Sequence, residues 1–402
     1  MSVLNGKKIL LGISGGIAAY KTASLVRLFI KAGAHVQVIM TPASKDFITP
    51  LTLSTLSKNP VYSSFYEKEN ENEKWNNHVE LGLWADLMIV APATANTLSK
   101  MANGVCDNLL IATYLSAKCP VYYAPAMDLD MYKHPSTVGT FSKLKEFSNT
   151  IIPAENGELA SGLSGEGRMA EPENILRFIE SDLESKLPLK GKKILVTAGP
   201  TYESMDPVRF IGNHSTGKMG FDIAQAAANM GALVILVTGP SHLILDNNLV
   251  KIIRVVSADD MFNACQLYFD EIDVVIASAA VADYKPKNPA VQKIKKAADE
   301  FTIQLEKTKD ILAFFGENKK SQYLIGFALE TENEIENAKL KIKKKNLDLI
   351  VLNSLQDEGA GFGKLTNKVT FIDKNFNVEP MELKSKEAVS IDIISKIIKH
   401  YA

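Results

Sequence analysis

The sequence predicts an α/β protein with two Rossmann-like domains, each a mainly parallel sheet flanked by helices. The opening Gly-Lys-Lys-Ile-Leu occurs at residues 6–10 and again at residues 191–195, each time as a short apolar run that leads into a glycine-containing turn. In both halves, apolar runs typical of strands alternate with segments of helical periodicity. That order of elements is typical of parallel sheets with helices on both faces.

The boundary between the two domains is expected just before the second opening. A chain of 402 residues is long for a single core and suits two domains. Residues 185–189 read Ser-Lys-Leu-Pro-Leu, a polar and proline-containing stretch typical of a linker. We therefore expect one domain over residues 1–188 and another over residues 189–402.

Composition narrows the class of protein. A net charge of −1 argues against a nucleic-acid partner, because phosphates attract strongly basic surfaces. The most apolar stretch, residues 81–95, is short and contains Asp86, so no membrane span is expected. There is no secretory signal pattern at the start. The three cysteines are odd in number and widely spaced, which indicates reduced thiols without a zinc site. These features predict a cytoplasmic enzyme.

Individual elements follow from periodicity. A helix is expected over residues 17–31, where apolar side chains recur at helical spacing and Gly33 follows. Strands are expected over residues 35–40, 87–90, 121–124, 233–237, 273–277 and 347–352. Residues 67–77 and 154–172 show no period and are expected to be irregular. The second of these is long and glycine-rich, so we interpret it as an active-site lid.

The turn after the first expected strand is a candidate phosphate site. Residues 12–16 read Gly-Ile-Ser-Gly-Gly, and glycines before a helix allow the backbone N–H groups to approach a phosphate. The turn does not fit Gly-x-Gly-x-x-Gly, so it favours a mononucleotide over a dinucleotide. Thr41 follows the second strand and either donates a hydroxyl to the same phosphate or caps a turn.

Four segments of the first half resemble the flavoprotein family of cysteine decarboxylases, which includes phosphopantothenoylcysteine decarboxylase. These are His78, Ala-Pro-Ala-Thr-Ala-Asn-Thr at residues 91–97, Pro-Ala-Met-Asp-Leu-Asp-Met-Tyr at 125–132, and a flap over 159–169 that ends in Gly-Glu-Gly-Arg-Met. The likeness covers nearly all of residues 5–180. It implies a flavodoxin-like domain that holds FMN and oxidises the thiol-bearing carbon, so that a C=S group stabilises the carbanion left by CO2.

The resemblance also implies roles for single residues. His78 is the expected base for thiol oxidation, Asn96 orients the flavin or the substrate, and Arg168 contacts the substrate's phosphate or carboxylate. The residues implied for FMN are Ser14, Gly15, Thr41 and Thr94, and the other substrate residues are Met127 and Met169.

Two positions depart from the family pattern. Ser161 stands where the flap commonly carries a proton-donating cysteine, and Asp128 stands where the family has asparagine. Serine is a far weaker acid than a thiol, so the final reduction requires another proton donor. An ionised Asp128 would repel a substrate carboxylate unless it is protonated, cation-paired or turned away. An oxidative cysteine decarboxylase that releases the enethiol therefore stays open for this half.

The second half resembles phosphopantothenoylcysteine synthetase, the ligase that follows the decarboxylase in many bacteria. The run Gly-Asn-His-Ser-Thr-Gly-Lys at residues 212–218 nearly fits a P-loop, but Met219 replaces the required hydroxyl residue, so a P-loop is not expected. The segments that carry the resemblance lie at residues 198–220, 277–284, 293–296, 326–331 and 344–353.

The resemblance implies that CTP converts 4′-phosphopantothenate to an acyl-cytidylate, which the amine of cysteine then attacks. Polyanionic substrates require cationic side chains and Mg²⁺ or Mn²⁺. Asn213 is expected to hold the acyl intermediate, Lys293 to act in catalysis, and Asp283 to hold the metal. The residues implied for CTP are Ala277, Ser278, Ala279, Asp283, Lys293, Thr308, Lys309, Asp310, Ile311, Phe327, Lys341 and Lys345, with 308–311 acting through the backbone.

The sequence argues against two further classes of protein. A flavin-holding regulatory module is disfavoured by the presence of His78, and a pyridine-nucleotide reductase is disfavoured because Gly-x-Gly-x-x-Gly is absent. By resemblance, we expect a homo-oligomer in which the decarboxylase halves are trimeric and the ligase halves dimeric.

Overall fold

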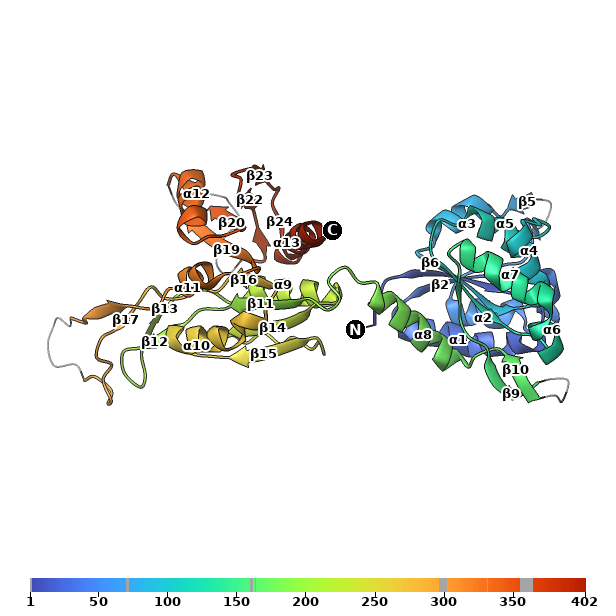
Figure 1. Cartoon of the computed structure of the whole chain (residues 1–402), viewed down its shortest axis with the longest axis horizontal. Coiled ribbons are helices and arrows are strands. Elements are labelled where there is room, and N and C mark those ends of the chain that lie inside the picture. Colours follow the sequence, from blue (N-terminus) through green and yellow to red (C-terminus); the bar gives the residue numbers. More distant parts are fainter. Residues whose placement is uncertain are drawn as a thin grey trace. The chain divides into compact units, whose positions relative to one another are not determined.

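The chain forms two compact units, one ending at Ser185 and one beginning at Lys186 (Figure 1). The computed structural model describes residues 2–69, 72–159, 162, 164–295, 302–330, 332–354 and 364–402. Within this described part of the chain, no helix combines the length and apolarity needed to cross a membrane.

The first unit contains a six-stranded sheet in the order β3-β2-β1-β6-β7-β8. All of its pairings are parallel, with Lys8 opposite His35 and Ile9 opposite Leu87. The strand order reverses at β1, so the carboxyl ends of β1 and β6 border a crevice. The strands are β1 (Lys8–Ile13), β2 (His35–Met40), β3 (Val61–Tyr62), β6 (Leu87–Ala93), β7 (Val121–Pro125) and β8 (Thr150–Ile151).

Helices cover both faces of this sheet, as the alternation of side chains along β1 requires. Ile9 and Leu11 are buried in the cluster that includes Phe29, whereas Leu10 is buried on the opposite face with Leu110. The Phe29 face carries α1 (Thr22–Lys31), α2 (Pro50–Ser57) and α8 (Pro172–Ser185). The other face carries α3 (His78–Trp84), α4 (Ala95–Asn103), α5 (Leu109–Ser116) and α7 (Pro135–Glu146). The short helices are η1 (Ile17–Lys21), η2 (Pro42–Asp46) and α6 (Leu129–Lys133).

Two segments expected to be irregular contain β-hairpins, and that expectation was wrong. Strand β4 (Tyr66–Glu69) pairs antiparallel with β5 (Asn72–Trp75), and the Tyr66 and Trp75 rings meet edge-on at 4.8 Å. Strand β9 (Glu155–Glu158) pairs in the same way with β10 (Ser164–Arg168). Short polar strands show no apolar alternation that would reveal them in the sequence.

The second unit is built on an eight-stranded sheet in the order β15-β14-β11-β16-β19-β20-β22-β23. Pairing is parallel from β15 to β20, and β22 and β23 are antiparallel. The order reverses at β11, so a crevice opens at the carboxyl ends of β11 and β16. The strands are β11 (Lys193–Ala198), β14 (Leu233–Thr238), β15 (Val250–Arg254), β16 (Val274–Ala277), β19 (Tyr323–Glu330), β20 (Leu349–Ser354), β22 (Val369–Asp373) and β23 (Val378–Pro380).

Helices again cover both faces of the second sheet. One face carries α9 (Lys218–Asn229) and α13 (Lys386–Tyr401). The other carries α10 (Ala258–Tyr268), η3 (Phe269–Glu271), α11 (Ile311–Asn318) and α12 (Glu334–Lys344). Three small hairpins complete the unit: β12 (Tyr202–Ser204) with β13 (Phe210–Gly212), β17 (Tyr284–Pro286) with β18 (Leu305–Lys307), and β21 (Thr366–Asn367) with β24 (Lys384–Ser385).

The repeated opening of the sequence occupies the same place in both sheets. The N–H of Lys8 donates to Asp86 Oδ2 at 2.9 Å, and the N–H of Lys193 donates to Asp273 Oδ2 at 2.8 Å. Each aspartate immediately precedes the strand that neighbours the opening strand, β6 or β16. One carboxylate thus joins the two central strands of each unit at their amino ends, away from the crevice.

Gly316 provides a test of packing in the second unit. A Cβ at Gly316 in α11 would lie 2.1 Å from the Lys345 carbonyl oxygen, whereas a Cβ at Gly139 in α7 would meet no atom within 4 Å. We expect Gly316→Ala to lower the free energy of unfolding of the second unit by about 1–3 kcal/mol. Gly139→Ala is the matched control, and it should be neutral or stabilising by up to about 1 kcal/mol, since alanine favours helix. Denaturant unfolding of the full chain checks this, and equal effects would contradict it.

Candidate functional site

A cavity of about 540 Å³ in the first unit collects several of the predicted substrate residues. Its wall comes from segments that follow β1 and β7 and from the β9–β10 hairpin. Gly167, at φ +135°, allows this hairpin to approach the segment after β7, because a Cβ there would lie 2.4 Å from the Met127 carbonyl oxygen. The predicted substrate residues Met127, Arg168 and Met169 line it, together with Asp128, which was predicted as a catalytic position.

The two cations at this cavity are already paired. Lys21 Nζ donates to Glu171 Oε1 at 2.9 Å, and Arg168 Nη2 donates to the same oxygen at 2.6 Å. Hydrogen bonding from Lys21, together with the charge of Arg168, holds the pKa of Glu171 below its ordinary value. Asp128 lines the same cavity, and its carboxylate has no hydrogen-bond or ion-pair partner among the described residues. The cavity therefore offers a carboxylate without a counter-ion.

The turn after β1 has the features of a phosphate site. Ser14 Oγ donates to the Pro92 carbonyl at 2.6 Å and accepts from the Thr94 N–H at 3.0 Å, so Ser14 joins the ends of β1 and β6. Gly15 packs closely here, because a Cβ would lie 2.8 Å from that of Ala43. The Thr41 hydroxyl is buried, with no hydrogen-bond partner in the described part of the chain. A buried hydroxyl without a partner is costly, so these residues fit a bound phosphate group.

The structure places His78 and Asn96 outside the cavity of Asp128. His78 begins α3, where Asn77 Oδ1 accepts from the N–H groups of Val79 and Glu80. Its ring meets those of Phe65 and Trp75 edge-on at 6.1 and 6.2 Å. Within the described residues, His78 Nδ1 is buried and lacks a hydrogen-bond partner.

Two further site residues predicted for the first unit are Asn96 and Ser161. Asn96 is exposed on the first turn of α4. The predicted proton-donor position, Ser161, lies outside the described residues.

A larger cavity of about 720 Å³ lies at the crevice of the second sheet. It brings together residues from β16, the β17–β18 hairpin, the start of α11, β19 and α12. Ser278 and Lys293 are the predicted nucleotide residues that do not line it: Ser278 Oγ donates to the Thr197 carbonyl at 2.6 Å, and Lys293 is exposed. The predicted residues that do line it are Asn213, Ala277, Ala279, Asp283, Thr308, Lys309, Asp310, Ile311, Phe327, Lys341 and Lys345.

Lysines dominate the electrostatics of this cavity. Lys341 Nζ donates to the Phe327 carbonyl at 3.0 Å, and burial lowers the pKa of Lys341, with the charge of Lys345 adding to the effect. Lys345 Nζ lies 2.5 Å from Asp310 Oδ2. Burial is the largest single influence on the pKa of Asp310 and would raise it, but the hydrogen bonds from Lys345 and the Ala313 N–H, with the charges of Lys345 and Lys341, together outweigh burial, and the net shift is downward. Such a site suits an anionic ligand.

Asn213 and Asp283 both line the larger cavity of the second unit. Asn213 Nδ2 donates to the carbonyls of Ala280 and Val281, at 3.0 and 3.3 Å, which fixes the direction of its amide. Among the described residues, no group of three His, Cys, Asp or Glu side chains could hold a metal ion. Proteins commonly bind Mg²⁺ through one or two carboxylates together with substrate phosphates, and the Asp283 carboxylate at this cavity would fit such an arrangement.

A neighbouring cavity of about 170 Å³ contains residues that the sequence did not reveal. It shares Phe327 with the larger cavity and is also lined by Asn353, Asn367 and Lys386. The buried Oδ1 atoms of both asparagines lack hydrogen-bond partners in the described structure. Lys386 is buried, and burial lowers its pKa. Two acceptors beside a buried amine fit a ligand that carries both donor groups and negative charge. Of these three, only Asn353 gave a signal, as a polar residue ending a strongly apolar run.

Comparison with known proteins identifies the family. Residues 189–401 match the family model described as DNA/pantothenate metabolism flavoprotein C-terminal domain, and residues 2–184 match the Flavoprotein model. The chain is 44% identical over 397 residues to the coenzyme A biosynthesis bifunctional protein CoaBC of Bacillus subtilis (strain 168), with 98% of this chain and 97% of that one covered. The chain belongs to the family of bifunctional coenzyme A biosynthesis proteins. The family, the α/β fold and the two-activity enzyme class predicted from the sequence are thereby confirmed, and the first unit is a flavoprotein domain.

The chain is also similar to two further proteins. The chain is 53% identical over 356 residues to a protein named cysteine/cysteine sulfinic acid decarboxylase from an unknown prokaryotic organism, covering 87% of this chain and 99% of that one. It is also similar to the crystal structure of the C-terminal domain of a CoaBC protein, at 42% identity and a TM-score of 0.46, with 54% of this chain and 98% of that one covered.

The shifted pKa of Lys341 predicts a pH-dependent affinity for polyphosphate. The ammonium form binds anions and is lost as pH rises through the folded-state pKa, which lies below the ordinary 10.5. Affinity for inorganic tripolyphosphate should therefore begin to fall at a lower pH than it would if Lys341 were exposed. Lys341→Arg keeps its charge throughout, so the ratio of wild-type to variant affinity should fall as pH rises. Isothermal titration calorimetry measures this ratio, and a constant value would refute the assignment.

Proposed function

We propose that the second unit couples 4′-phosphopantothenate to cysteine with CTP, and that the first unit decarboxylates the resulting 4′-phosphopantothenoylcysteine. The observation that carries the proposal is the gathering of Lys341, Lys345 and Phe327 at the crevice of a sheet whose unit belongs to this family. Triphosphate and phosphopantothenate are both polyanions, and partly buried lysines recognise such ligands in a site of reduced dielectric.

In the second unit, the proposed roles follow from what each side chain already contacts. Lys341 and Lys345 bind phosphate oxygens, and Lys345 exchanges Asp310 for the ligand as it does so. Asn213 has its Nδ2 fixed by two backbone carbonyls, which leaves Oδ1 to orient the acyl group. Asp283 binds Mg²⁺ carried by the nucleotide, and the neighbouring cavity of Asn353 and Asn367 accepts donor groups of the substrates.

In the first unit, Thr41 and the turn at Gly15 hold the phosphate of FMN, and His78 acts as the base at the thiol. When bound, FMN supplies the two-electron oxidation that makes the loss of CO2 feasible. The orphaned hydroxyl of Thr41 and the orphaned Nδ1 of His78 support these assignments. His78 lies apart from the residues that line the Asp128 cavity, which supports a site completed by a second copy of the chain.

We accordingly propose that the chain works as a cytoplasmic homo-oligomer, with trimeric decarboxylase units and dimeric ligase units. Light scattering with size-exclusion chromatography measures the assembly. A monomer with full decarboxylase activity would overturn this part of the proposal.

The two activities should separate by mutation. His78→Gln should lower decarboxylation of supplied phosphopantothenoylcysteine by about 10²–10⁴-fold, the usual contribution of a general base, and leave CTP-dependent pyrophosphate release intact. Lys341→Met should lower kcat/KM for CTP by about 10–100-fold through the loss of a charge-assisted contact, with decarboxylation unchanged. Pyrophosphate and CO2 release are assayed on each full-length variant. Loss of both activities in either variant, or no CTP-dependent release from the wild type, would refute the assignment.

Free cysteine is a second candidate substrate for the first unit. Lys21 and Arg168 are both paired with Glu171, while Asp128 in the cavity has no partner in the described residues. An uncompensated carboxylate favours a substrate with an α-ammonium group, which acylated cysteine lacks. The 53% identical relative named for cysteine decarboxylation supports the same substrate.

Replacing Asp128 should change the preference between these substrates. Asp128→Asn should lower the ratio of kcat/KM for cysteine to that for phosphopantothenoylcysteine by about tenfold or more. Glu158→Gln, which removes a carboxylate at the rim of the same cavity, is the matched control and should change the ratio less. CO2 release is measured with each substrate. If the wild type does not turn over free cysteine, or if both variants shift the ratio equally, this second candidate is wrong.

A further inference from the structure

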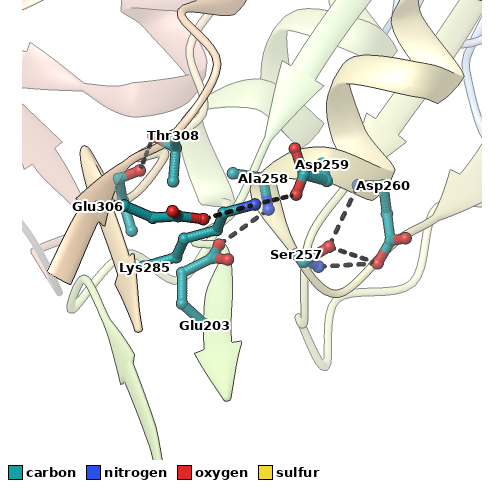
Figure 2. Close-up of polar contacts among 9 residues, drawn as sticks. Glu203, Ser257, Ala258, Asp259, Asp260, Lys285, Glu306 and Thr308 are labelled. Carbon is teal, nitrogen blue, oxygen red and sulfur yellow. Dashed lines mark hydrogen bonds and ion pairs between the residues drawn. The ribbon is translucent and has the colours of Figure 1, made fainter. Parts of the chain in front are cut away.

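A polar network in the second unit joins the β17–β18 hairpin to α10 (Figure 2), and neighbouring residues of the hairpin line the larger cavity. Lys285 on β17 places its Nζ 2.6 Å from Asp259 Oδ2 on α10 and 3.7 Å from Glu306 Oε1 on β18. Lys285 thus joins the β17–β18 hairpin to the first turn of α10. It does not line the cavity itself.

The first turn of α10 is held firmly in place. Ser257 and Asp260 form a capping box, and Glu203 Oε1 accepts from the Ala258 N–H at 2.8 Å. Glu203 is 3% exposed, so its carboxylate is a buried cap from β12 (Figure 2). With the N–H groups of the first turn bound in this way, Asp259 starts from a fixed position. The hydrogen bond that Lys285 donates to Asp259, with the charges of Asp259, Glu306 and Glu203, raises the pKa of Lys285.

The β17–β18 hairpin connects Lys285 to residues that line the cavity. Tyr284 pairs with Lys307 across the hairpin, next to the pairing of Lys285 with Glu306. Thr308 N–H then donates to the Asp283 carbonyl at 3.0 Å, and Thr308 Oγ1 donates to the Ala282 carbonyl at 2.6 Å. Asp283 and Thr308 both line the cavity. A shift of Lys285 would therefore move two parts of the wall together.

A second contact of α10 supports the other side of the same wall. Phe262 lies three residues after Asp259, so the two side chains share a face of the helix. Lys309 Nζ lies 4.5 Å from the Phe262 ring centroid, and the Phe314 ring of α11 meets Phe262 edge-on at 5.0 Å. Lys309 follows Thr308 and also lines the cavity. One face of α10 thus contacts both the hairpin and the loop that bound the site.

We infer that this face of α10 sets the shape of the nucleotide cavity, and that Asp259 and Lys285 are positioning residues for the ligase reaction. The inference rests on the proposed function of the second unit. Neither side chain is assigned a contact with substrate, so their effect should fall on binding of the nucleotide more than on turnover. Loss of a partly exposed ion pair predicts a change of about three- to fivefold.

The test measures CTP-dependent pyrophosphate release by the full chain. Lys285→Met and Asp259→Asn should each raise KM for CTP about three- to fivefold with kcat within about twofold of wild type. Because one pair carries the effect, the double variant should match the singles rather than multiply them. Lys285→Arg keeps the charge and should restore KM. Decarboxylation by the first unit of the same polypeptide should stay unchanged.

Asp270→Asn is the matched control, because Asp270 pairs with Lys320 on the same unit at 2.9 Å but with both side chains largely exposed. It should alter neither KM nor kcat. A purely structural role for Lys285 would lower the thermal midpoint of the second unit without a rise in KM, and that result overturns the inference. The inference is also overturned if Lys285→Arg and Lys285→Met change kcat and KM by the same factors. If the wild type shows no CTP-dependent release, the proposed function fails and this inference with it.

Discussion

Each unit depends on the reversal of strand order at its first strand. From β1 the chain builds β2 and β3 on one side and then returns to build β6, β7 and β8 on the other; β11 has the same position in the second sheet. Crossovers that leave the carboxyl edge in opposite directions cannot fill the space between them. The crevice is thus a consequence of connectivity. Residues far apart in the sequence, such as Ala277 on β16 and Phe327 on β19, line one cavity there because these neighbouring parallel strands run to the same edge.

Ion pairs within the cavities determine which charged contacts must be broken when an anionic ligand binds. Lys345 is paired with Asp310, and Lys21 and Arg168 share Glu171. These pairs hold the cations in place before a ligand arrives, but each must be exchanged when an anion binds. Lys341 differs, because its Nζ donates to the Phe327 carbonyl rather than to a carboxylate. An anion can therefore bind Lys341 without breaking an ion pair.

Much of the fold could be predicted because buried parallel strands are continuous apolar runs. The strand at residues 35–40 was predicted with the bounds it has, and the one at 87–90 continues to Ala93. The β4–β5 and β9–β10 hairpins were missed because cross-strand pairs, not an apolar periodicity, stabilise such short polar strands. The helix expected over 17–31 is present but begins with the 3-10 turn η1.

The predicted site residues divide in the same way. Several residues within motifs that follow strands line the two larger cavities, such as Met127 after β7 and Ala279 after β16, but Thr94 and Asn96, at the end of β6, are not among the lining residues. His78 and Lys293 are not among the residues that line the two larger cavities, because shared motif membership does not fix the position of a side chain. Asn367 and Lys386 were missed because they enter from β21 and α13, late in the chain and outside any motif. Only tertiary structure places them beside Phe327.

The aspartates at the amino edges of the two sheets have a wider consequence. Asp86 and Asp273 make the same bond to the opening strand in units that carry different cavities. The half of each sheet that secures the central strands is thus separate from the half that meets ligands. Loops at the carboxyl edge can diverge, lengthen or be exchanged while the frame stays intact. The same α/β frame thus occurs twice in this chain, and the carboxyl-edge loops of either copy could acquire new chemistry without a change in the frame.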